Sequence, residues 1–382
     1  MRNCVLCLPL TLPAQVRLGL TLTPFVVSMV SKLTGLASVC CLNPTGMRYK
    51  GLRNADISQR SEQFRRLMER LGTPMERYWA DSEKNHIVHL QDYCDSLVGS
   101  GQLQSRVATK LICKCGAVEI IENAVNPALL KNHKVIRQRD NQLSCKLCGA
   151  TLETIKESSL LLESQFADSA VKVYPAFYHK EIKTLENDYD QPLLVSRQMK
   201  GGVSVSLFGR KWQLDTDFCW SFLFSSLIEE GYRPTVVVVS NRSLKPLVWS
   251  LGISRKLTDL LQNVSVIVTP YMQSQGESDS ARWIVRELIE RYGSSPVRLM
   301  LGSALKWDQK EVTLDSSAIF WGLKALARDS VAVPGTDKAY SVPEALELME
   351  GGYVDQLVTD LRKANYVQLS TYGNLLLRKV GP

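Results

Sequence analysis

The stretch from Asn3 to Gly46 decides the fold of this chain. It reads NCVLCLPLTLPAQVRLGLTLTPFVVSMVSKLTGLASVCCLNPTG. Residues 3–10 predict a short buried strand, and the apolar residues between 21 and 34 recur at helical spacing, which predicts a helix with one buried face. Residues 36–42 are again β-prone, and Asn43-Pro44-Thr45-Gly46 is typical of a turn. Strand, helix and strand in this order begin a doubly wound parallel sheet.

Two later apolar runs continue the α/β pattern. Val236–Val239 are four valines in a row, which is typical of a parallel strand buried on both faces. Residues 264–269 predict a second parallel strand. Helices are expected at 54–71, 83–99, 244–251, 255–261 and 281–292.

The composition indicates a globular protein with a large core. Of the 382 residues, 45% are apolar and 22% are charged. The formal net charge of +8 fits a surface that faces RNA, although charge alone favours an ordinary basic protein. Ten cysteines in a chain of this length favour a reducing compartment over a disulfide scaffold, so we expect a cytoplasmic protein.

The sparsely charged N-terminal region raises the alternative of a signal peptide or membrane anchor. The apolar stretch Cys4–Pro13 follows Arg2, as in a signal peptide. Arg17 interrupts this character and no Ala-x-Ala site follows. The next apolar stretch, Leu18–Val30, has 13 residues, fewer than the ~20 needed to cross a bilayer. We therefore expect a buried strand and helix here, and no membrane association.

Two cysteine pairs give the strongest local signal. The pairs are Cys113-Lys114-Cys115-Gly116 and Cys145-Lys146-Leu147-Cys148-Gly149. Pairs at this separation can converge on one tetrahedral ion, so Cys113, Cys115, Cys145 and Cys148 are predicted to hold a structural zinc. The alternative is a module of reduced cysteines without metal, because Cys-x-Cys is less usual than Cys-x-x-Cys. Four other cysteines stand in apolar contexts and are expected in the core: Cys40, Cys41, Cys94 and Cys219.

In this order, the features resemble the catalytic core of a class I, methionyl-type aminoacyl-tRNA synthetase. Pro13-Ala14-Gln15-Val16-Arg17-Leu18-Gly19-Leu20 lies where that family has Pro-x-x-x-x-His-Leu-Gly-His. Leu194-Val195-Ser196-Arg197 matches an Ile-Ser-Arg element, and Phe218-Cys219-Trp220 stands where a Val-Trp-Phe-Asp strand belongs. Residues 288–299 resemble the helix and Tyr-Gly-Ala-Asp-Ala-x-Arg stretch beyond the second signature loop.

The resemblance implies a Rossmann-like nucleotide-binding core interrupted by a zinc-knuckle module. Residues 1–104 would form the first half of the core, 105–165 the inserted module, and 166–314 the second half. Residues 315–382 would form a short helical C-terminal region, too small for a complete anticodon-binding domain.

The residues that such enzymes use to bind ATP are largely missing. The family's two histidines contact the phosphates, its glycine lets adenine lie against the backbone, and a Lys-Met-Ser-Lys-Ser loop stabilises the leaving pyrophosphate. Here Arg17 and Gly19 are the remaining nucleotide-binding candidates, and Leu20 cannot donate a hydrogen bond. The second loop, 270–280, contains no lysine and two acids. The sequence thus argues against ordinary use of ATP and magnesium.

The amino-acid pocket implied by the resemblance has changed as well. By position it would include Asn43, Trp220 and Asn241. The family places acids near the substrate ammonium, but Cys41–Gly46 and Trp220–Leu223 contain none. The Gly-Lys-Asp element reads Ser240-Asn241-Arg242.

Three further groups are weaker candidates. His86 and His89 stand one helical turn apart and could share a metal, but solvated or capping roles are favoured. Asp215 and Asp217 could form an acid pair, or simply end a hairpin. Arg210-Lys211-Trp212 combines cations with an aromatic ring and could touch nucleic acid, although a turn before a strand is favoured.

Three functions compete on this basis. The first is a synthetase-derived binding or accessory protein that no longer activates amino acids and acts with a protein partner. The second is a divergent ATP-dependent aminoacyl ligase with a remodelled site. The third is a protein that binds tRNA or aminoacyl-tRNA at the acceptor end. DNA is not expected as a partner.

Overall fold

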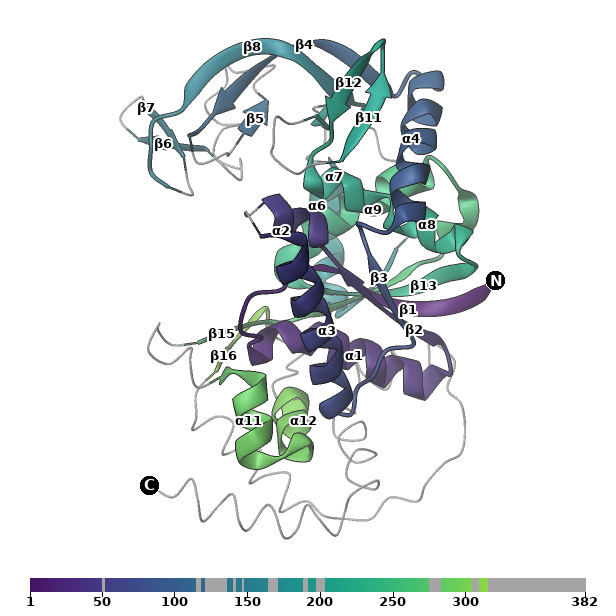
Figure 1. Cartoon of the computed structure of the whole chain (residues 1–382), viewed down its shortest axis with the longest axis vertical. Coiled ribbons are helices and arrows are strands. Elements are labelled where there is room, and N and C mark those ends of the chain that lie inside the picture. The colour runs from purple at the N-terminus through teal and green to yellow at the C-terminus, as the bar shows by residue number, and fades with distance from the viewer. Residues whose placement is uncertain are drawn as a thin grey trace.

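The computed structural model describes residues 1–49, 52–114, 118–120, 136–139, 142–145, 148–163, 171–187, 192–196, 203–274, 283–303 and 309–314. The predicted helical region 315–382, Cys115 and the loop residues 275–280 lie outside these ranges. In the described part, a parallel sheet occupies the centre and an antiparallel sheet lies above it in the view of Figure 1.

The central sheet confirms the predicted α/β class. Its strands are parallel and follow the order β3-β2-β1-β13-β14-β9. The order reverses between β1 and β13, which is the switch point of a doubly wound sheet. The bounds are β1 (Arg2–Leu10), β2 (Ala37–Leu42), β3 (Arg77–Ala80), β9 (Lys172–Tyr174), β13 (Tyr232–Ser240) and β14 (Ser265–Thr269).

Both faces of this sheet are buried, as the valine run predicts. Successive side chains of a strand point to opposite faces, so Val236 and Val238 enter one core cluster and Val237 and Val239 enter the other. All four are at most 1% exposed. A strand covered on both faces has no polar positions, which explains the continuous apolar sequence.

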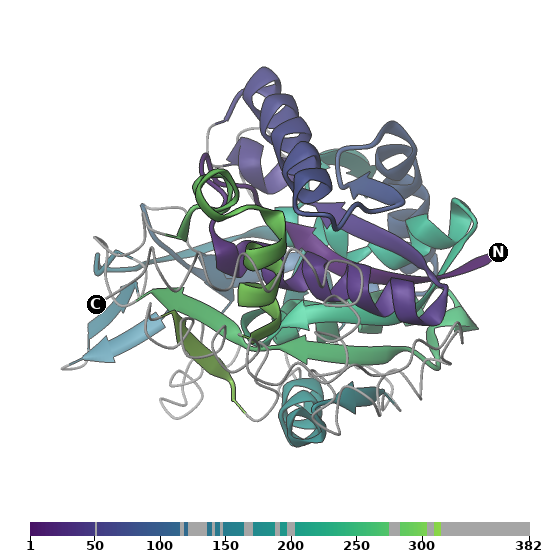
Figure 2. The ribbon, with the colours of Figure 1, turned by 90° about the horizontal axis from the view of Figure 1, so that it is seen from below.

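Helices cover the sheet on both sides. One core cluster draws on α1 (Leu18–Thr34), α3 (Asn54–Arg70), α11 (Val285–Tyr292) and α12 (Ser294–Ser303). Figure 2 shows α1 lying across the strands. The other cluster draws on α4 (Lys84–Gly99), α6 (His179–Asn187), α7 (Thr216–Ser221), α8 (Leu223–Glu229) and α9 (Leu244–Arg255).

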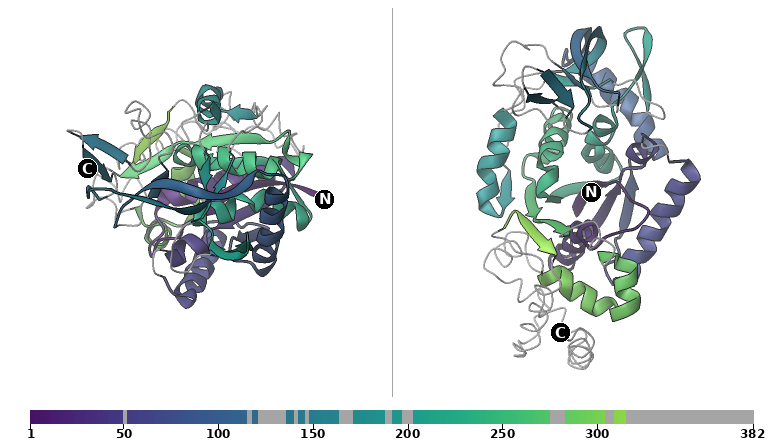
Figure 3. Two further views of the ribbon diagram at one scale, coloured as in Figure 1. Left: turned by 90° about the horizontal axis from the view of Figure 1, so that it is seen from above. Right: turned by 90° about the vertical axis from the view of Figure 1, so that its left-hand side faces the viewer.

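The antiparallel sheet follows α4 in the chain and has the order β10-β8-β4-β5 (Figure 3). Its longest pairing joins β4 and β8 from Leu103↔Leu162 to Ile112↔Glu153. The bounds are β4 (Leu103–Ile112), β5 (Val118–Ile120), β8 (Glu153–Leu162) and β10 (Leu193–Leu194). The exact domain limits, 1–104, 105–165, 166–314 and 315–382, stay a prediction.

Three two-stranded ribbons and some short helical segments complete the described elements. The ribbons pair β6 (Ile136–Arg139) with β7 (Gln142–Cys145), β11 (Ser204–Leu207) with β12 (Arg210–Gln213), and β15 (Tyr271–Ser274) with β16 (Glu311–Leu314). The short segments are α2 (Pro44–Tyr49) and the 3₁₀ turns η1 (Ala176–Tyr178), η2 (Asn241–Ser243) and η3 (Asp259–Leu261).

The predicted turn at Asn43–Gly46 is wrong, because this segment begins helix α2. The Asn43 side-chain oxygen accepts a hydrogen bond from the Gly46 amide at 2.6 Å, and Pro44 takes the first helical position. Asparagine before proline is a good helix start as well as a good turn. The first helix also begins earlier than predicted, at Leu18.

Two other predicted elements differ from the structure. The expected strand at Phe218–Trp220 is part of helix α7, in which the Cys219 amide donates to the Asp215 carbonyl at 3.0 Å. The expected helix at 255–261 is wrong, because α9 ends at Arg255. The Thr258 side chain then accepts a hydrogen bond from the Leu260 amide and starts η3. Helix α11 begins at Val285, later than the predicted 281.

The hydrophobic stretch near the N-terminus forms β1 and α1. Among the described residues, no helix combines the length and the apolar character that a membrane span requires.

Substitutions of two glycines test whether the left-handed conformation of Gly35 stabilises the C-terminal end of helix α1. Gly35 closes α1 with φ 69°, whereas Gly99 is the last residue of α4, and a Cβ at either position meets no atom within 4 Å. We expect Gly35→Ala to lower the free energy of unfolding by about 1 kcal/mol, because the left-handed conformation disfavours a Cβ. Gly99→Ala is the matched control and should leave stability unchanged or slightly raised. Urea denaturation measures both, and equal effects would contradict this account.

Candidate functional site

The candidate residues gather where the parallel strands end. Arg17 and Gly19 follow β1, Asn43 follows β2, and Asn241 follows β13. In an open α/β sheet, ligands bind outside the carboxyl ends of the strands near the switch point. The topology therefore places these four predicted residues on one edge of the sheet.

The loop after β1 is joined to the segment that follows the second signature loop. Arg17 forms an antiparallel bridge with Ile284, and the Val285 amide donates to the Val16 carbonyl at 3.0 Å. The Arg17 side chain is exposed. Arg17 can therefore still present a cation at this edge, as predicted, while its backbone is held in place.

Gly19 lies directly against β15. A Cβ at Gly19 would stand 3.2 Å from both the Cβ and the carbonyl oxygen of Met272. Such a separation is tighter than ordinary van der Waals contact, so a side chain at this position would require β15 to shift by a few tenths of an ångström. Gly19, which was predicted to contact a nucleotide, thus packs against strand β15 of the protein itself.

A buried acid, Asp81, occupies the same edge and was missed as a site residue. Asp81 follows β3 and is 0% exposed. Its carboxylate accepts hydrogen bonds from the amide of Thr45 at 3.0 Å and from the Thr45 hydroxyl. The segment after β2 contains no acid of its own, but its Thr45 is hydrogen-bonded to Asp81, which follows the neighbouring strand β3. The adjacency of parallel strand ends is a signal that could have identified Asp81 as a site residue.

Residues 218–220, expected in a strand, lie in helix α7. A nearby strand that does contain a tryptophan is β12, with Trp212, and Leu214-Asp215 follow it before α7 begins. Trp220 lies in α7, and its membership of the pocket stays a prediction.

Asp81 and Asp215 both act on one buried thiol. Burial raises the pKa of Cys219 well above its usual range, and the nearby carboxylates of Asp81 and Asp215 raise that pKa further. Both acids, one after β3 and one after β12, therefore contribute to the electrostatic environment of Cys219. The alternative pair Asp215–Asp217 is untested, since the Asp217 side chain lies outside the described residues.

Asn241 serves as an anchor for β16. Its side-chain amide donates to the Lys310 carbonyl at 2.7 Å, and the same carbonyl accepts from the Tyr271 amide at 2.9 Å. Next to it, the Arg242 guanidinium lies 3.6 Å from the Tyr271 ring centroid and 3.4 Å from a Glu311 carboxylate oxygen. These contacts fasten β15 and β16 to the end of β13.

A second set of contacts fastens the same ribbon to α6. The Lys310 ammonium stands 2.5 Å from Glu181 and 5.5 Å from the ring centroid of Tyr178. Burial raises the pKa of Tyr178 to about 12, with help from Glu181. The ribbon of β15 and β16, whose first strand opens the second loop, is therefore held on two sides.

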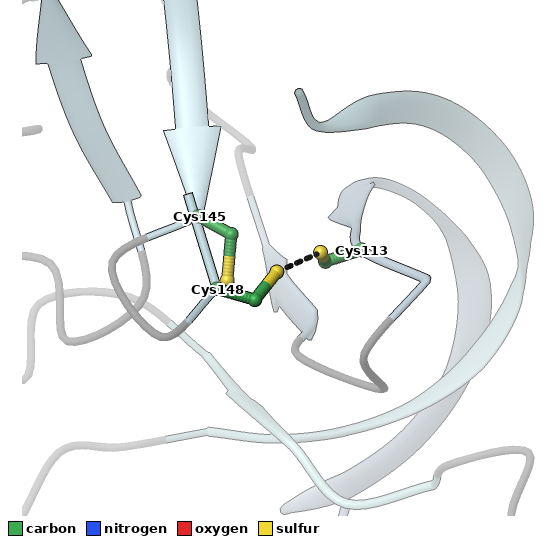
Figure 4. A group of neighbouring side chains, drawn as sticks. All are labelled: Cys113, Cys145 and Cys148. Carbon is green, nitrogen blue, oxygen red and sulfur yellow. Dashed lines mark hydrogen bonds between the residues drawn. The ribbon is translucent and has the colours of Figure 1, made fainter. Parts of the chain in front are cut away.

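Three of the four predicted zinc ligands converge, as Figure 4 shows. The sulfur atoms of Cys113, Cys145 and Cys148 lie within 4.8 Å of one another, and Cys113 and Cys148 are 3.3 Å apart. A tetrahedral zinc with Zn–S bonds of about 2.3 Å separates its sulfurs by roughly 3.8 Å. The spacing therefore fits one zinc ion. Cys115 lies outside the described residues, so its role as fourth ligand stays a prediction.

The other cysteines predicted for the core are confirmed there. Cys40, Cys41, Cys94 and Cys219 are all 0% exposed. Burial raises the pKa of the Cys94 thiol to about 12, which keeps it uncharged at neutral pH.

His86 is neither solvated nor placed to share a metal with His89. His86 is 1% exposed, its Nδ1 stands 2.6 Å from the Ser226 hydroxyl, and its Nε2 stands 2.9 Å from the Cys219 carbonyl oxygen. His89 instead contacts Glu229, with 2.9 Å between its Nε2 and the carboxylate. The favoured sequence interpretation of His86 as a surface residue is wrong, because helix α4 turns it into the core.

The basic-aromatic segment Arg210-Lys211-Trp212 forms strand β12, not a turn before a strand. Trp212 is 5% exposed, and its indole N–H donates to the Leu207 carbonyl at 2.9 Å. Its ring is therefore closed to a nucleic-acid base.

Comparisons with solved structures decide the fold. Over 100% of this chain and 92% of the other, the structure matches Mycobacterium tuberculosis methionyl-tRNA synthetase in complex with methionyl-adenylate, at 13% identity and a TM-score of 0.66. The chain has the fold of methionyl-tRNA synthetase. A second methionyl-adenylate complex of that enzyme matches at 12% identity and a TM-score of 0.66, covering 99% of this chain and 85% of the other. The apo form matches at 13% identity and a TM-score of 0.59, covering 100% and 90%.

The resemblance drawn from sequence is therefore confirmed as a synthetase fold. No protein-family model matches the chain, and no curated protein matches its sequence. The activity of a methionyl-tRNA synthetase does not follow from the fold.

Zinc binding can be tested with the converging thiols. We expect purified protein to carry about one zinc ion per chain, because three thiolates already face one point. Cys148→Ser should lower the zinc content sharply, as measured by elemental mass spectrometry. Cys94→Ala, which alters a core cysteine, should retain the metal. Full zinc content in the Cys148→Ser protein would contradict the site.

His86 should make stability depend on pH. Burial lowers the pKa of His86 from 6.5 to about 4. Below pH 6.5 the unfolded chain binds a proton that the folded chain excludes, so stability is complete above that pH and declines as the pH falls towards 4. Between pH 7 and pH 5 the expected loss is about 2 kcal/mol in the free energy of unfolding.

The control for this titration is His86→Gln, which removes the titrating ring. Urea denaturation at several pH values should show a flatter dependence for His86→Gln than for the wild type. His89→Gln should keep the wild-type slope. The same slope in all three proteins would rule out His86 as the cause.

Proposed function

We propose that this protein is a synthetase-derived binding or accessory protein that does not carry out ordinary ATP-dependent amino-acid activation. Its proposed ligand is the acceptor end of tRNA or aminoacyl-tRNA, and its proposed location is the cytoplasm. Zinc, in this proposal, stabilises the inserted module and takes no part in chemistry.

The contact between Gly19 and Met272 carries the proposal. The synthetase pattern keeps the glycine of its first motif so that adenine can lie against the backbone. Here Met272 lies against Gly19, so that a Cβ at this position would stand 3.2 Å from Met272. The neighbouring Leu18 is 0% exposed. Strand β15 thus covers the backbone that the synthetase pattern offers to adenine, which supports a protein that does not bind ATP in the ordinary way.

The charges near this edge support the same proposal. The loop 270–280 has no lysine to stabilise a leaving pyrophosphate, and its acids would repel one. Within the described residues, the Asp81 carboxylate is already engaged by Thr45, so it is poorly placed to hold a substrate ammonium.

The proposed tRNA ligand rests on the fold and on charge. The net charge of +8 favours association with a polyanion. The measurement is a gel-shift assay with aminoacyl-tRNA, without ATP, at several salt concentrations. Binding in this assay would support this part of the proposal. Equally tight binding of an unrelated duplex RNA would show that the protein is not specific for tRNA acceptor ends.

The proposal predicts no adenylation. Purified, zinc-loaded protein should neither bind ATP in calorimetry nor catalyse pyrophosphate exchange with any of the twenty amino acids. The mycobacterial methionyl-tRNA synthetase serves as the positive control for the assay. Exchange above background with one amino acid would overturn the proposal.

The alternative is a divergent ligase with a remodelled site, and Asp215 favours it. Asp215 follows the Trp-containing strand, as the synthetase pattern requires of an ammonium-binding acid, and Arg17 remains exposed as a cation for phosphate. If exchange is observed, Asp215→Asn should abolish it, whereas Asp95→Asn on the exposed side of α4 should not.

A further inference from the structure

The turn between β11 and β12 holds an aromatic residue in an unfavourable conformation. Phe208 has φ 53° and Gly209 has φ 72°. Two consecutive positive φ values in a two-residue hairpin turn suit Asn-Gly or Gly-Gly, whereas a bulky residue there is strained. The Phe208 side chain is also 49% exposed, so the hairpin tip combines backbone strain with an exposed apolar ring.

The hairpin beneath this ring is firmly held. The Gln91 side chain of α4 accepts from the Ser206 amide at 2.8 Å and donates to the Ser206 carbonyl at 3.1 Å. On the partner strand, buried Trp212 donates to the Leu207 carbonyl. Phe208 is thus presented on a preorganised support, which reduces the entropy lost when a ligand binds.

Cations stand beside the ring. Arg210 and Lys211 are exposed, and the hairpin Ser204–Gln213 contains no acid. The Arg210 guanidinium carbon lies 3.4 Å from the Trp212 ring centroid, and its Nη2 donates to the Ser158 carbonyl at 3.4 Å. These contacts hold Arg210 on the surface next to the tip.

The nearby acids are engaged with other side chains. Asp95 accepts a hydrogen bond from Gln91 at 3.0 Å, and Glu157 pairs with buried Lys110 at 2.7 Å. Glu157 is therefore balanced by a cation, and the hairpin itself contributes two cations and no acid beside its exposed ring. Single-stranded nucleic acids combine a stackable base with a phosphate, and complement both features.

We propose that the β11–β12 tip binds single-stranded nucleic acid, with a base stacked on Phe208 and the two flanking phosphates contacted by Arg210 on one face of the hairpin and by Lys211 on the other. This assigns the nucleic-acid role to Phe208 in place of buried Trp212. The proposal is independent of the proposed function, because it uses no residue at the carboxyl edge of the parallel sheet. Figure 1 places the hairpin beside α4, at the end of the molecule that carries β4 and β8.

The test is fluorescence anisotropy of a short labelled oligouridine with the full chain. Wild-type protein should bind it with an affinity that falls as salt rises. Phe208→Asn should weaken binding about tenfold, because it removes the stacking ring. Since asparagine tolerates positive φ, this variant should melt at or above the wild-type temperature. Phe208→Trp keeps a ring and should keep binding.

Two further comparisons separate the tip from general surface charge. Lys211→Gln should weaken binding and reduce the salt dependence by about 0.7 in the slope of log affinity against log salt. Phe177, an exposed aromatic residue on η1, supplies the matched control, and Phe177→Ala should bind as the wild type does. Wild-type affinity in Phe208→Asn would overturn the proposal. Absence of oligouridine binding by the wild type would overturn it as well and would point to a protein partner for the tip.

Discussion

The constraint on which the rest of the structure depends is burial of the parallel sheet on both faces. The valines of β13 point alternately into two separate cores, one on each face of the sheet. The helices on both faces are therefore needed to keep these valines out of solvent. This requirement fixes the order of the strands and hence which loops meet at their carboxyl ends. Asn43, Asp81 and Asn241 come together only because β2, β3 and β13 are packed into one sheet.

At that edge the protein makes contacts with itself. Met272 packs against Gly19, and the Asp81 carboxylate accepts a hydrogen bond from the Thr45 amide. The Asn241 side-chain amide donates a hydrogen bond to the Lys310 carbonyl. In each case a residue that the synthetase pattern reserves for a ligand, or that lies beside such a residue, is engaged by a neighbouring segment. The described contacts thus join several loops at the carboxyl edge of the sheet to one another, which is the basis of the function proposed above.

The sequence predicted the sheet well and the site unevenly. The strands at 3–10 and 236–239 and the cysteine pairs carry strong local patterns, because burial on two faces or a shared ion demands particular residue types. Residues 218–220 were expected in a strand and lie in helix α7, because a short apolar run does not by itself distinguish a strand from a buried helix. Asp81 was missed because it reaches Thr45 across two neighbouring strands, a relation that no short motif records.

The pairing of β1 with β13 has a consequence for the time at which the fold can form. Arg2 lies opposite Tyr232, so the centre of the sheet stays open until the chain between them has been made. At about 5–20 residues per second, synthesis of this interval takes roughly 10 to 50 s. Through that period the apolar edge of β1 lacks its neighbour, and such an edge readily pairs with other chains. This order of strands therefore leaves the N-terminal half without its central partner strand for most of the chain's synthesis.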